Sequence, residues 1–253
     1  MDIVIERAQG VLSIVLNRAE KKNAITAAMY QEMADGLYEA ENDPTVRAVL
    51  LRGNGGAFSA GNDLEDFLND PPKGLDAPVF QFLRRLSAMP KPVVAAVAGV
   101  AVGIGTTMLL HCDIVYAAKN AKFSLPFVQL GLCPEAASSL LLPRIAGYQR
   151  AAEKLLLGEA FDVTEAISMG FVNGALDAAE LDAHAFERAR RLAALPASSL
   201  KTTKALMKSE QRNEVAARME EEAAHFSRML SAPEAREAFA AFLEKRKADF
   251  SRV

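Results

Sequence analysis

The chain has 253 residues, of which 51% are hydrophobic and 24% are charged, and its formal net charge is −3. This composition supplies enough apolar surface for a substantial core and argues against disorder as the main state. Because Lys and Arg are scattered among Asp and Glu, the chain lacks the overall basic field that nucleic-acid binding usually needs. We therefore expect one compact α/β domain with a helical extension and no nucleic-acid partner.

The two cysteines, Cys112 and Cys133, stand neither in a metal-ligand spacing nor in a disulfide framework, so reduced thiols are expected. The N-terminus begins with a strand-like run rather than with the basic and apolar segments of an export signal. The longest apolar stretch, residues 92–110, is interrupted by glycines and threonines, which is typical of buried strand–turn–helix structure. We expect a cytoplasmic protein without a membrane span.

The N-terminal part of the chain predicts a hairpin, a helix and a strand. Residues 3–16 contain two β-rich runs separated by Gln9-Gly10, which predicts a β-hairpin. After Thr26, a suitable N-cap, apolar residues recur at helical spacing and predict an amphipathic helix. Residues 46–52 predict a strand that ends at a glycine-rich turn, and this strand end is a candidate site.

The same pattern recurs further along the chain. Residues 92–97 predict a buried strand, 99–105 a glycine-rich turn and 106–110 the start of a buried helix. Later short strands and helices continue the alternation, which favours parallel crossover units over a helix bundle. Strand signals then vanish, so we expect a core over residues 1–182 and a helical region over residues 183–253 that supports subunit contacts.

The turns around Ala60 and Ile104 each follow an expected strand. Small residues there let main-chain N–H groups approach a ligand, and two such donors would form an oxyanion hole. If Ile104 begins a helix, the helix dipole adds to this effect. For either turn alone, close strand–helix packing is the commoner reason for such glycines.

Motifs spread over nearly the whole chain accompany these two turns. They are Leu16-Asn17-Arg18, Lys22-Asn23-Ala24, Phe58-Ser59-Ala60-Gly61-Asn62-Asp63-Leu64, residues 90–97 with Gly99, Cys112-Asp113, Ala121-Lys122-Phe123, Leu142-Pro143-Arg144, Glu165-Ala166, Gly170-Phe171-Val172 and residues 241–247. In these motifs the chain resembles the enoyl-CoA hydratase/isomerase, or crotonase, superfamily.

The resemblance implies a crotonase-like spiral of ββα units that assembles as a homotrimer or a dimer of trimers. It implies an acyl-CoA thioester as substrate, with coenzyme A as part of the substrate and neither a separate cofactor nor a metal. It assigns the N–H groups of Ala60 and Ile104 to the oxyanion hole. Phe242 and Lys245 match residues that approach coenzyme A bound to a neighbouring subunit. The other residues implied at the substrate are Ser59, Gly61, Asn62, Asp63, Leu64, Phe127 and Leu132.

The side chains must decide which reaction is catalysed. Hydratases of the family use two glutamates, at positions that match Thr107 and Phe127, and neither of these residues can supply a carboxylate. Residues 131–139 instead resemble the catalytic segment of peroxisomal-type Δ3,Δ2-enoyl-CoA isomerases and their bacterial relatives, and Glu135 matches their catalytic glutamate. We therefore expect a single-glutamate isomerase in which burial beside Phe127 and Leu132 raises the Glu135 pKa.

Two alternatives stay open, namely a hydratase or other crotonase lyase and a catalytically inactive acyl-CoA-binding protein. Asp63 is expected to serve structure or substrate positioning, and Cys133 to form a pocket wall. The three histidines are not clustered with metal ligands, so packing or surface roles are expected for them.

Overall fold

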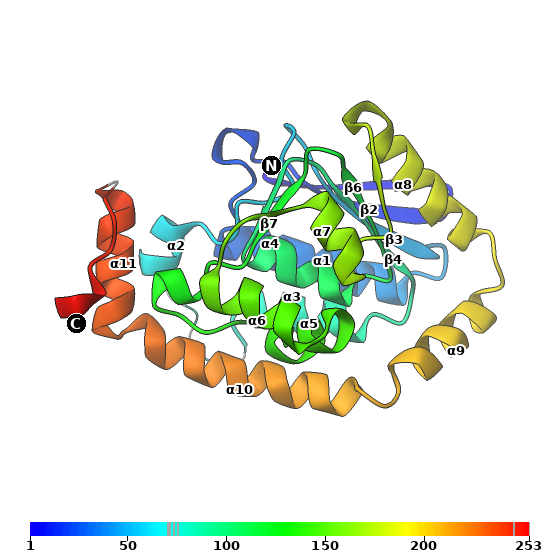
Figure 1. Cartoon of the computed structure of the whole chain (residues 1–253). Helices are drawn as coiled ribbons and strands as arrows, with labels where there is room; N and C mark the ends of the chain where they lie inside the picture. The colour runs from blue at the N-terminus through cyan, green and yellow to red at the C-terminus, as the bar shows by residue number, and fades with distance from the viewer. Residues whose placement is uncertain (70–71, 73, 75, 245, 253) are drawn as a thin grey trace.

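The computed structural model describes residues 1–69, 72, 74, 76–244 and 246–252 (Figure 1). Its largest element is a six-stranded sheet, in which all neighbouring strands are parallel except the antiparallel first pair. In spatial order its strands are β1 (Ile3–Ala8), β2 (Val11–Leu16), β3 (Ala48–Gly53), β4 (Val93–Val97), β6 (Ile114–Ala118) and β9 (Gly174–Leu176).

A second, three-stranded sheet lies beside the first. Its spatial order is β5 (Val100–Val102), β7 (Lys122–Ser124) and β8 (Phe161–Asp162). β5 and β7 are parallel, whereas β7 and β8 are antiparallel. The expected glycine-rich turn over residues 99–105 therefore contains a strand, since Val100, Ala101 and Val102 pair with β7.

The N-terminal hairpin and the first helix form as the sequence predicts. Gln9 and Gly10 have φ values of +51° and +79°, which suits a two-residue turn between antiparallel strands. Helix α1 (Ala27–Asn42) begins after Thr26, whose side chain accepts a hydrogen bond from the Met29 N–H at 3.3 Å. This N-cap satisfies one of the N–H groups that a helix start leaves open.

Helices cover both faces of the large sheet because successive strand residues point to opposite sides. Leu51 belongs to the core on the side of α1 and α3 (Pro78–Ala88), which pack against each other. Leu50 belongs to a second apolar cluster with α8 (Ala178–Ala193). The near-continuous apolar sequence of β3 thus reflects burial on both faces.

The remaining helices surround the two sheets. They are α2 (Leu64–Asn69), α4 (Ile104–Thr107), α5 (Ser138–Ala146), α6 (Tyr148–Leu157), α7 (Val163–Met169), α9 (Ala197–Lys208), α10 (Arg212–Leu230) and α11 (Pro233–Leu243), with short 3-10 helices at Ala19–Lys21, Met108–His111, Val128–Leu130 and Phe250–Arg252. The buried helix expected over residues 106–110 is therefore a short α4 followed by a 3-10 turn. Among the described residues no strand follows β9, as expected for the C-terminal region.

The boundary expected between residues 182 and 183 falls inside α8. This helix packs against β3, β4 and β6, so its apolar face belongs to the sheet. The C-terminal helices then return to the core, because α10 contacts α5 and α11 contacts the 3-10 helix Val128–Leu130 (Figure 1). This return places α10 and α11 beside the strand ends that carry the candidate site.

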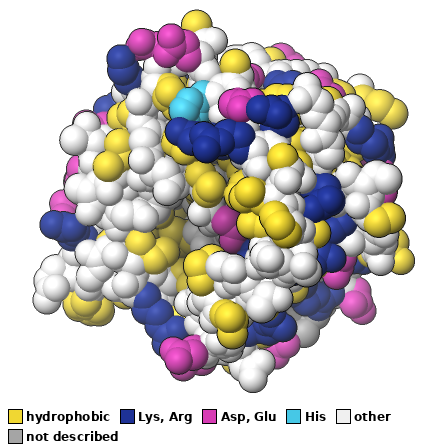
Figure 2. Space-filling model, turned by 90° about the vertical axis from the view of Figure 1, so that its right-hand side faces the viewer, with side chains coloured by type: hydrophobic (Ala, Val, Ile, Leu, Met, Phe, Trp, Pro, Cys, Tyr) yellow, Lys and Arg dark blue, Asp and Glu magenta, His cyan; other side chains and the backbone are white. Residues whose placement is uncertain are grey.

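The surface carries charges of both signs. On the face shown in Figure 2, Lys and Arg side chains are interspersed with Asp and Glu, and hydrophobic side chains lie between them. In the part of the chain that the structure describes, no helix combines the length and the apolar character needed to cross a membrane.

Gly99 lies at the tight connection between β4 and β5. Its φ is +57°, and a Cβ there would lie 2.1 Å from the Gly56 carbonyl oxygen. Directly after it, the Val100 carbonyl accepts hydrogen bonds from the N–H groups of Phe58 and Ser59 at 3.1 and 3.0 Å. The absent side chain at position 99 thus lets the two glycine-rich turns approach each other.

Gly99→Ala should lower the free energy of unfolding by at least about 3 kcal/mol, because a steric clash adds to the cost of the left-handed backbone. Gly56→Ala is the matched control, since Gly56 has a φ of +74° but a Cβ there would have no described neighbour within 4 Å. The control should cost only about 1–2 kcal/mol. Urea unfolding measures both, and equal losses would contradict the close approach.

Candidate active site

Two glycine-rich turns meet at the ends of β3 and β5. Ser59 pairs with Ala101 in a parallel bridge, and the Val102 N–H donates to the Ser59 carbonyl at 3.0 Å. A Cβ on Gly61 would lie 2.9 Å from the Val102 carbonyl oxygen, and a Cβ on Gly105 would lie 2.9 Å from the Ser59 carbonyl oxygen. Glycine at both positions therefore allows the backbones of the two turns to touch.

The main-chain donors in these turns differ in availability. The Ala60 N–H donates to the Lys22 carbonyl at 2.9 Å, so it is engaged within the protein. This corrects the expectation that Ala60 supplies an oxyanion donor. The N–H groups of Asn62 and Ile104 donate to no other described residue. Two residues beyond Ala60, Asn62 thus presents the unengaged donor of the first turn.

A cavity of about 900 Å³ lies where the two turns meet. This volume is at the upper end of the range for small-molecule sites. The first turn and α2, the second turn, the segment between β7 and α5, and helices α10 and α11 all contribute walls. The lining residues include Ala60, Gly61, Asn62, Asp63, Leu64, Ile104, Phe127, Leu132, Glu135, Phe226, Phe239 and Phe242.

Three of the expected substrate residues need separate comment. Ser59 is fully buried and does not line the cavity, since its hydroxyl donates to the Asn23 carbonyl at 2.9 Å and accepts from the Gly61 N–H at 3.1 Å. It supports the first turn instead. Phe242 is 61% exposed and lines the cavity of its own chain, and its expected approach to coenzyme A on a neighbouring subunit stays a prediction. Lys245 lies outside the described residues.

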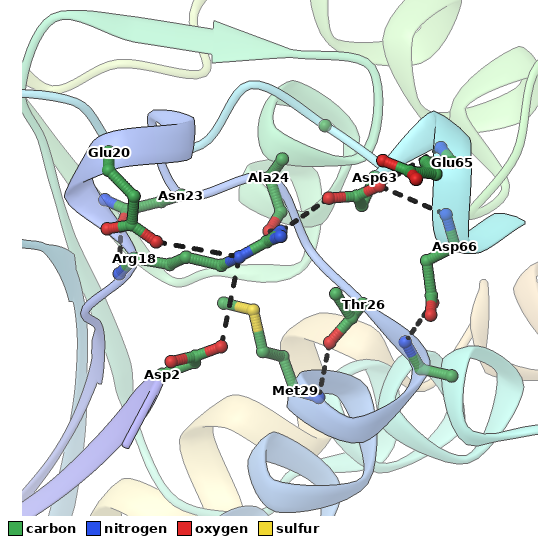
Figure 3. Close-up of polar contacts among 12 residues, drawn as sticks. Asp2, Arg18, Glu20, Asn23, Ala24, Thr26, Met29, Asp63, Glu65 and Asp66 are labelled. Carbon is green, nitrogen blue, oxygen red and sulfur yellow. Dashed lines mark hydrogen bonds and ion pairs between the residues drawn. The ribbon is translucent and has the colours of Figure 1, made fainter.

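An ion pair fixes the polar end of the first turn (Figure 3). Arg18 donates from Nη1 to Asp63 Oδ2 at 2.6 Å and to the Ala24 carbonyl at 3.1 Å. Asp63 Oδ1 accepts from the N–H groups of Glu65 and Asp66, both at 3.1 Å, at the start of α2. Burial opposes ionisation of Asp63, but the hydrogen bond from Arg18 and the other donors outweigh it and lower the pKa. The Asp63 carboxylate is therefore occupied in holding the turn.

Glu135 lies in the wall of the cavity. Its Oε1 atom is inaccessible to solvent and has no hydrogen-bond partner among the described residues. Burial, assisted by the negative charge of Glu222, raises the pKa of the Glu135 carboxyl to about 8. Burial and the charge of Glu135 also raise the pKa of Tyr30, whose hydroxyl donates to Asn62 Oδ1. Glu135 is thus an unpaired carboxyl group that can exchange a proton near neutral pH.

The backbone turns sharply directly after Glu135. Ala136 and Ala137 have φ values of +60° and +54°, a conformation that costs roughly 1–2 kcal/mol per residue outside glycine. The His111 ring donates from Nε2 to the Ala136 carbonyl at 2.8 Å, and burial lowers the pKa of His111 to about 4. A neutral histidine therefore helps to hold this turn, which is the packing role that the sequence predicts.

A second buried acid, Glu222 on α10, was not expected from the sequence. Its Oε2 accepts from the Ala137 N–H at 2.6 Å, and its Oε1 accepts from the Ser139 N–H and hydroxyl at 3.0 and 2.5 Å. One signal could have revealed it, because Glu222 shares a helical stripe with the buried residues Met219 and Phe226. A charged residue in an apolar stripe needs a buried partner.

The positions that match the hydratase glutamates carry no acid. Thr107 is fully buried, and its hydroxyl has no hydrogen-bond partner in the described structure, while Phe127 lines the cavity. Burial raises the pKa of the Cys133 thiol to about 11, so it is not an activated nucleophile. Within the described ranges, no group of three or more His, Cys, Asp or Glu side chains is placed to hold a metal ion.

The chain is similar to known proteins over nearly all of its length. A 1,2-epoxyphenylacetyl-CoA isomerase of Escherichia coli (strain K12) is 36% identical, with 99% of each chain covered. The enoyl-CoA delta isomerase 2 of Homo sapiens is 34% identical over 84% of this chain and 56% of its own length. A crystal structure of an enoyl-CoA hydratase/isomerase from Pseudoalteromonas atlantica T6c has a TM-score of 0.94 at 42% identity, with 99% of this chain and 100% of that chain covered.

The family model described as enoyl-CoA hydratase/isomerase matches residues 6–252. This match and the structural similarity confirm the expected α/β fold of the crotonases with its helical C-terminal region. Enzymes of this family act on coenzyme A thioesters. The chain therefore belongs to the enoyl-CoA hydratase/isomerase family.

Proposed function

We propose that the protein isomerises 3-enoyl-CoA to 2-enoyl-CoA and that Glu135 is its only proton shuttle. The observation that carries this proposal is the buried, unpaired Glu135 carboxyl, whose pKa is raised to about 8, in the wall of the cavity. A general acid–base catalyst is most effective when its pKa lies near the operating pH. The similarity to a relative named enoyl-CoA delta isomerase 2 supports this reaction, whereas the relative named 1,2-epoxyphenylacetyl-CoA isomerase acts on a different coenzyme A ester.

In the proposed reaction the thioester oxygen accepts hydrogen bonds from the N–H groups of Ile104 and Asn62. The Glu135 carboxylate removes a proton from C2, and the electron pair of the C2–H bond forms a dienolate with negative charge on the thioester oxygen. The thioester C=O bond then re-forms and a double bond forms between C2 and C3. The electron pair of the former C3–C4 double bond takes the proton from Glu135 at C4. A single preorganised donor of this kind is worth about 3–4 kcal/mol of barrier reduction.

The cavity walls suit this assignment. Ile104 is the first residue of α4, so its N–H has no acceptor within the helix. Ala60 lines the cavity but supplies no hydrogen-bond donor to it. We place the acyl-CoA against Gly61, Leu64, Phe127, Leu132 and Phe242, which line the same cavity. The apolar side chains near Glu135 would keep water away from the dienolate.

Hydration would require a second acid near Glu135 to activate and position water. Besides Glu135, the carboxylates that line the cavity among the described residues are those of Asp63 and Glu65. Asp63 is paired with Arg18, and Glu65 is exposed on α2. Glu222, the other acid near Glu135, already accepts three hydrogen bonds at the start of α5. The available acids thus favour isomerisation over hydration, and they leave the inactive acyl-CoA-binding alternative to experiment.

Glu135→Gln should reduce the turnover of 3-enoyl-CoA by at least about a hundredfold, because the amide cannot carry the proton. Affinity for acyl-CoA should stay within about threefold, since the amide has nearly the same shape. Absorbance of the conjugated product measures turnover, and isothermal titration measures affinity. The matched control is Glu180→Gln, an exposed acid on α8, which should leave turnover unchanged.

Near-normal turnover by Glu135→Gln would reject Glu135 as the shuttle. A parallel assay with 2-enoyl-CoA tests the alternative reaction, because robust hydration by the unmodified protein would favour a hydratase. Binding of acyl-CoA without either reaction would favour the inactive binding protein.

The rate should depend on pH with a known sign. Because the ionised Glu135 is the base and its pKa is raised to about 8, kcat/KM should rise about tenfold per pH unit below that value and level off above it. A steady-state profile between pH 6 and 9.5 measures this. A flat profile across that range would contradict the raised pKa.

We also propose that the protein assembles as a homotrimer or a dimer of trimers. Large apolar side chains are exposed on two helices, among them Tyr148 and Leu156 on α6 and Leu206 and Met207 on α9. Burial of such side chains between subunits would remove apolar surface from water. Light scattering should give three or six times the mass of one chain, and a monomer over a broad concentration range would contradict the assembly.

A further inference from the structure

Helix α5 is capped by a carboxylate from a distant part of the chain. The N–H groups of Ala137 and Ser139, at the start of α5, donate to Glu222 on α10 at 2.6 and 3.0 Å. Such N–H groups carry the positive end of the helix dipole and attract an acidic side chain. Residues just before a helix usually provide that side chain, because their oxygen atoms reach the first turn locally.

Glu135 is the acid that lies just before α5 in the sequence, three residues ahead of its first residue, Ser138. Its main-chain carbonyl already lies over the first turn, where it accepts from the Ser138 N–H at 3.0 Å and hydroxyl at 2.6 Å. A Glu135 carboxylate that accepted the N–H groups of Ala137 and Ser139 would be ionised at a low pKa. It would then be a poor base and would be drawn away from the cavity.

In the structure Glu222, not Glu135, accepts the hydrogen bonds from the N–H groups of Ala137 and Ser139. Both of its oxygens are engaged, whereas Oε1 of Glu135 has no partner among the described residues. We propose that Glu222 is a positioning residue that caps α5 in place of Glu135 and so leaves the Glu135 carboxyl unpaired in the cavity. The link to catalysis rests on the proposed isomerase function, but the structural role does not.

The charged groups around Glu135 and Glu222 influence the pKa of both carboxyl groups. Burial raises the pKa of Glu222, while hydrogen bonds from Ser139 and Ala137 and the charge of Arg218 act in the opposite direction. Three donors on its two oxygens favour its ionised form, and that charge adds to burial in raising the Glu135 pKa. Glu135 also lines a second cavity of about 60 Å³, whose other titratable residues besides Glu222 are Arg84 and Glu220. The titratable groups at the larger cavity or beside the Glu135 turn are Lys21, Asp63, Glu65, Arg246, Lys247, Cys133 and His111, and Tyr30 interacts with the charge of Glu135.

Infrared difference spectroscopy can test the inference without any turnover. The C=O stretching band of protonated Glu135, assigned by its loss in Glu135→Gln, should disappear in the wild-type protein with a midpoint near pH 8. In Glu222→Gln the midpoint should fall by at least about one pH unit, because the neighbouring charge is lost and a helix donor becomes free. An unchanged midpoint in a folded Glu222→Gln protein would overturn the inference.

Two further measurements separate positioning from a merely structural role. With 3-enoyl-CoA, Glu222→Gln should reduce kcat at least about tenfold with KM within about threefold and should move the acidic limb of the pH profile down with the infrared midpoint. Glu180→Gln, which removes the same charge from an exposed position on α8, should leave the infrared midpoint unchanged. A kcat loss without a midpoint shift would reduce Glu222 to a packing residue and overturn the proposal.

If Glu222→Gln does not fold, the wild-type titration still decides, because a Glu135 midpoint below about pH 6 would mean that Glu135 is not held unpaired. The outcomes also separate the two proposals. A midpoint shift without any isomerisation by the wild-type protein would reject the proposed function and keep the capping role. Isomerisation without a shift would do the reverse.

Discussion

The hydrogen bonds between the end of β3 and the start of β5 hold the rest of the architecture together. Through Val100 and Ser59 they join the six-stranded sheet to the three-stranded sheet. This contact is possible because Gly61, Gly99 and Gly105 lack a Cβ where another backbone passes. The cavity exists where these turns meet, so fold and site depend on the same constraint.

The site contains two neighbouring acids with opposite surroundings. Glu222 receives three hydrogen bonds and acts as part of the framework, whereas Glu135 receives none on Oε1 and has a raised pKa. Burying an acid without partners destabilises the folded state. The left-handed Ala136 and Ala137 add strain at the same place. Strain and an unpaired polar atom thus coincide at Glu135, as is usual for functional sites.

The C-terminal helices complete the cavity rather than forming a separate unit. Phe226 on α10 and Phe239 on α11 line it together with the strand-end turns, and Phe67 on α2 packs edge-to-face against Phe226 at 6.0 Å between ring centroids. Glu222 reaches α5 from the same helix. The region that the sequence marks as a helical extension therefore supplies both walls and a polar anchor to the site.

The sequence by itself determined the local elements and the type of site. The hairpin at Gln9-Gly10, the Thr26 cap and the buried strands follow from backbone preferences and apolar spacing, which act over a few residues. The motifs were sufficient to indicate the family, and the choice of Glu135 among the acids stays a prediction. Tertiary structure alone decided that the Ala60 N–H is taken by Lys22, that Ser59 is buried and that Glu222 caps α5. Each of these features depends on contacts with residues that are distant in sequence. No local sequence pattern carries that information.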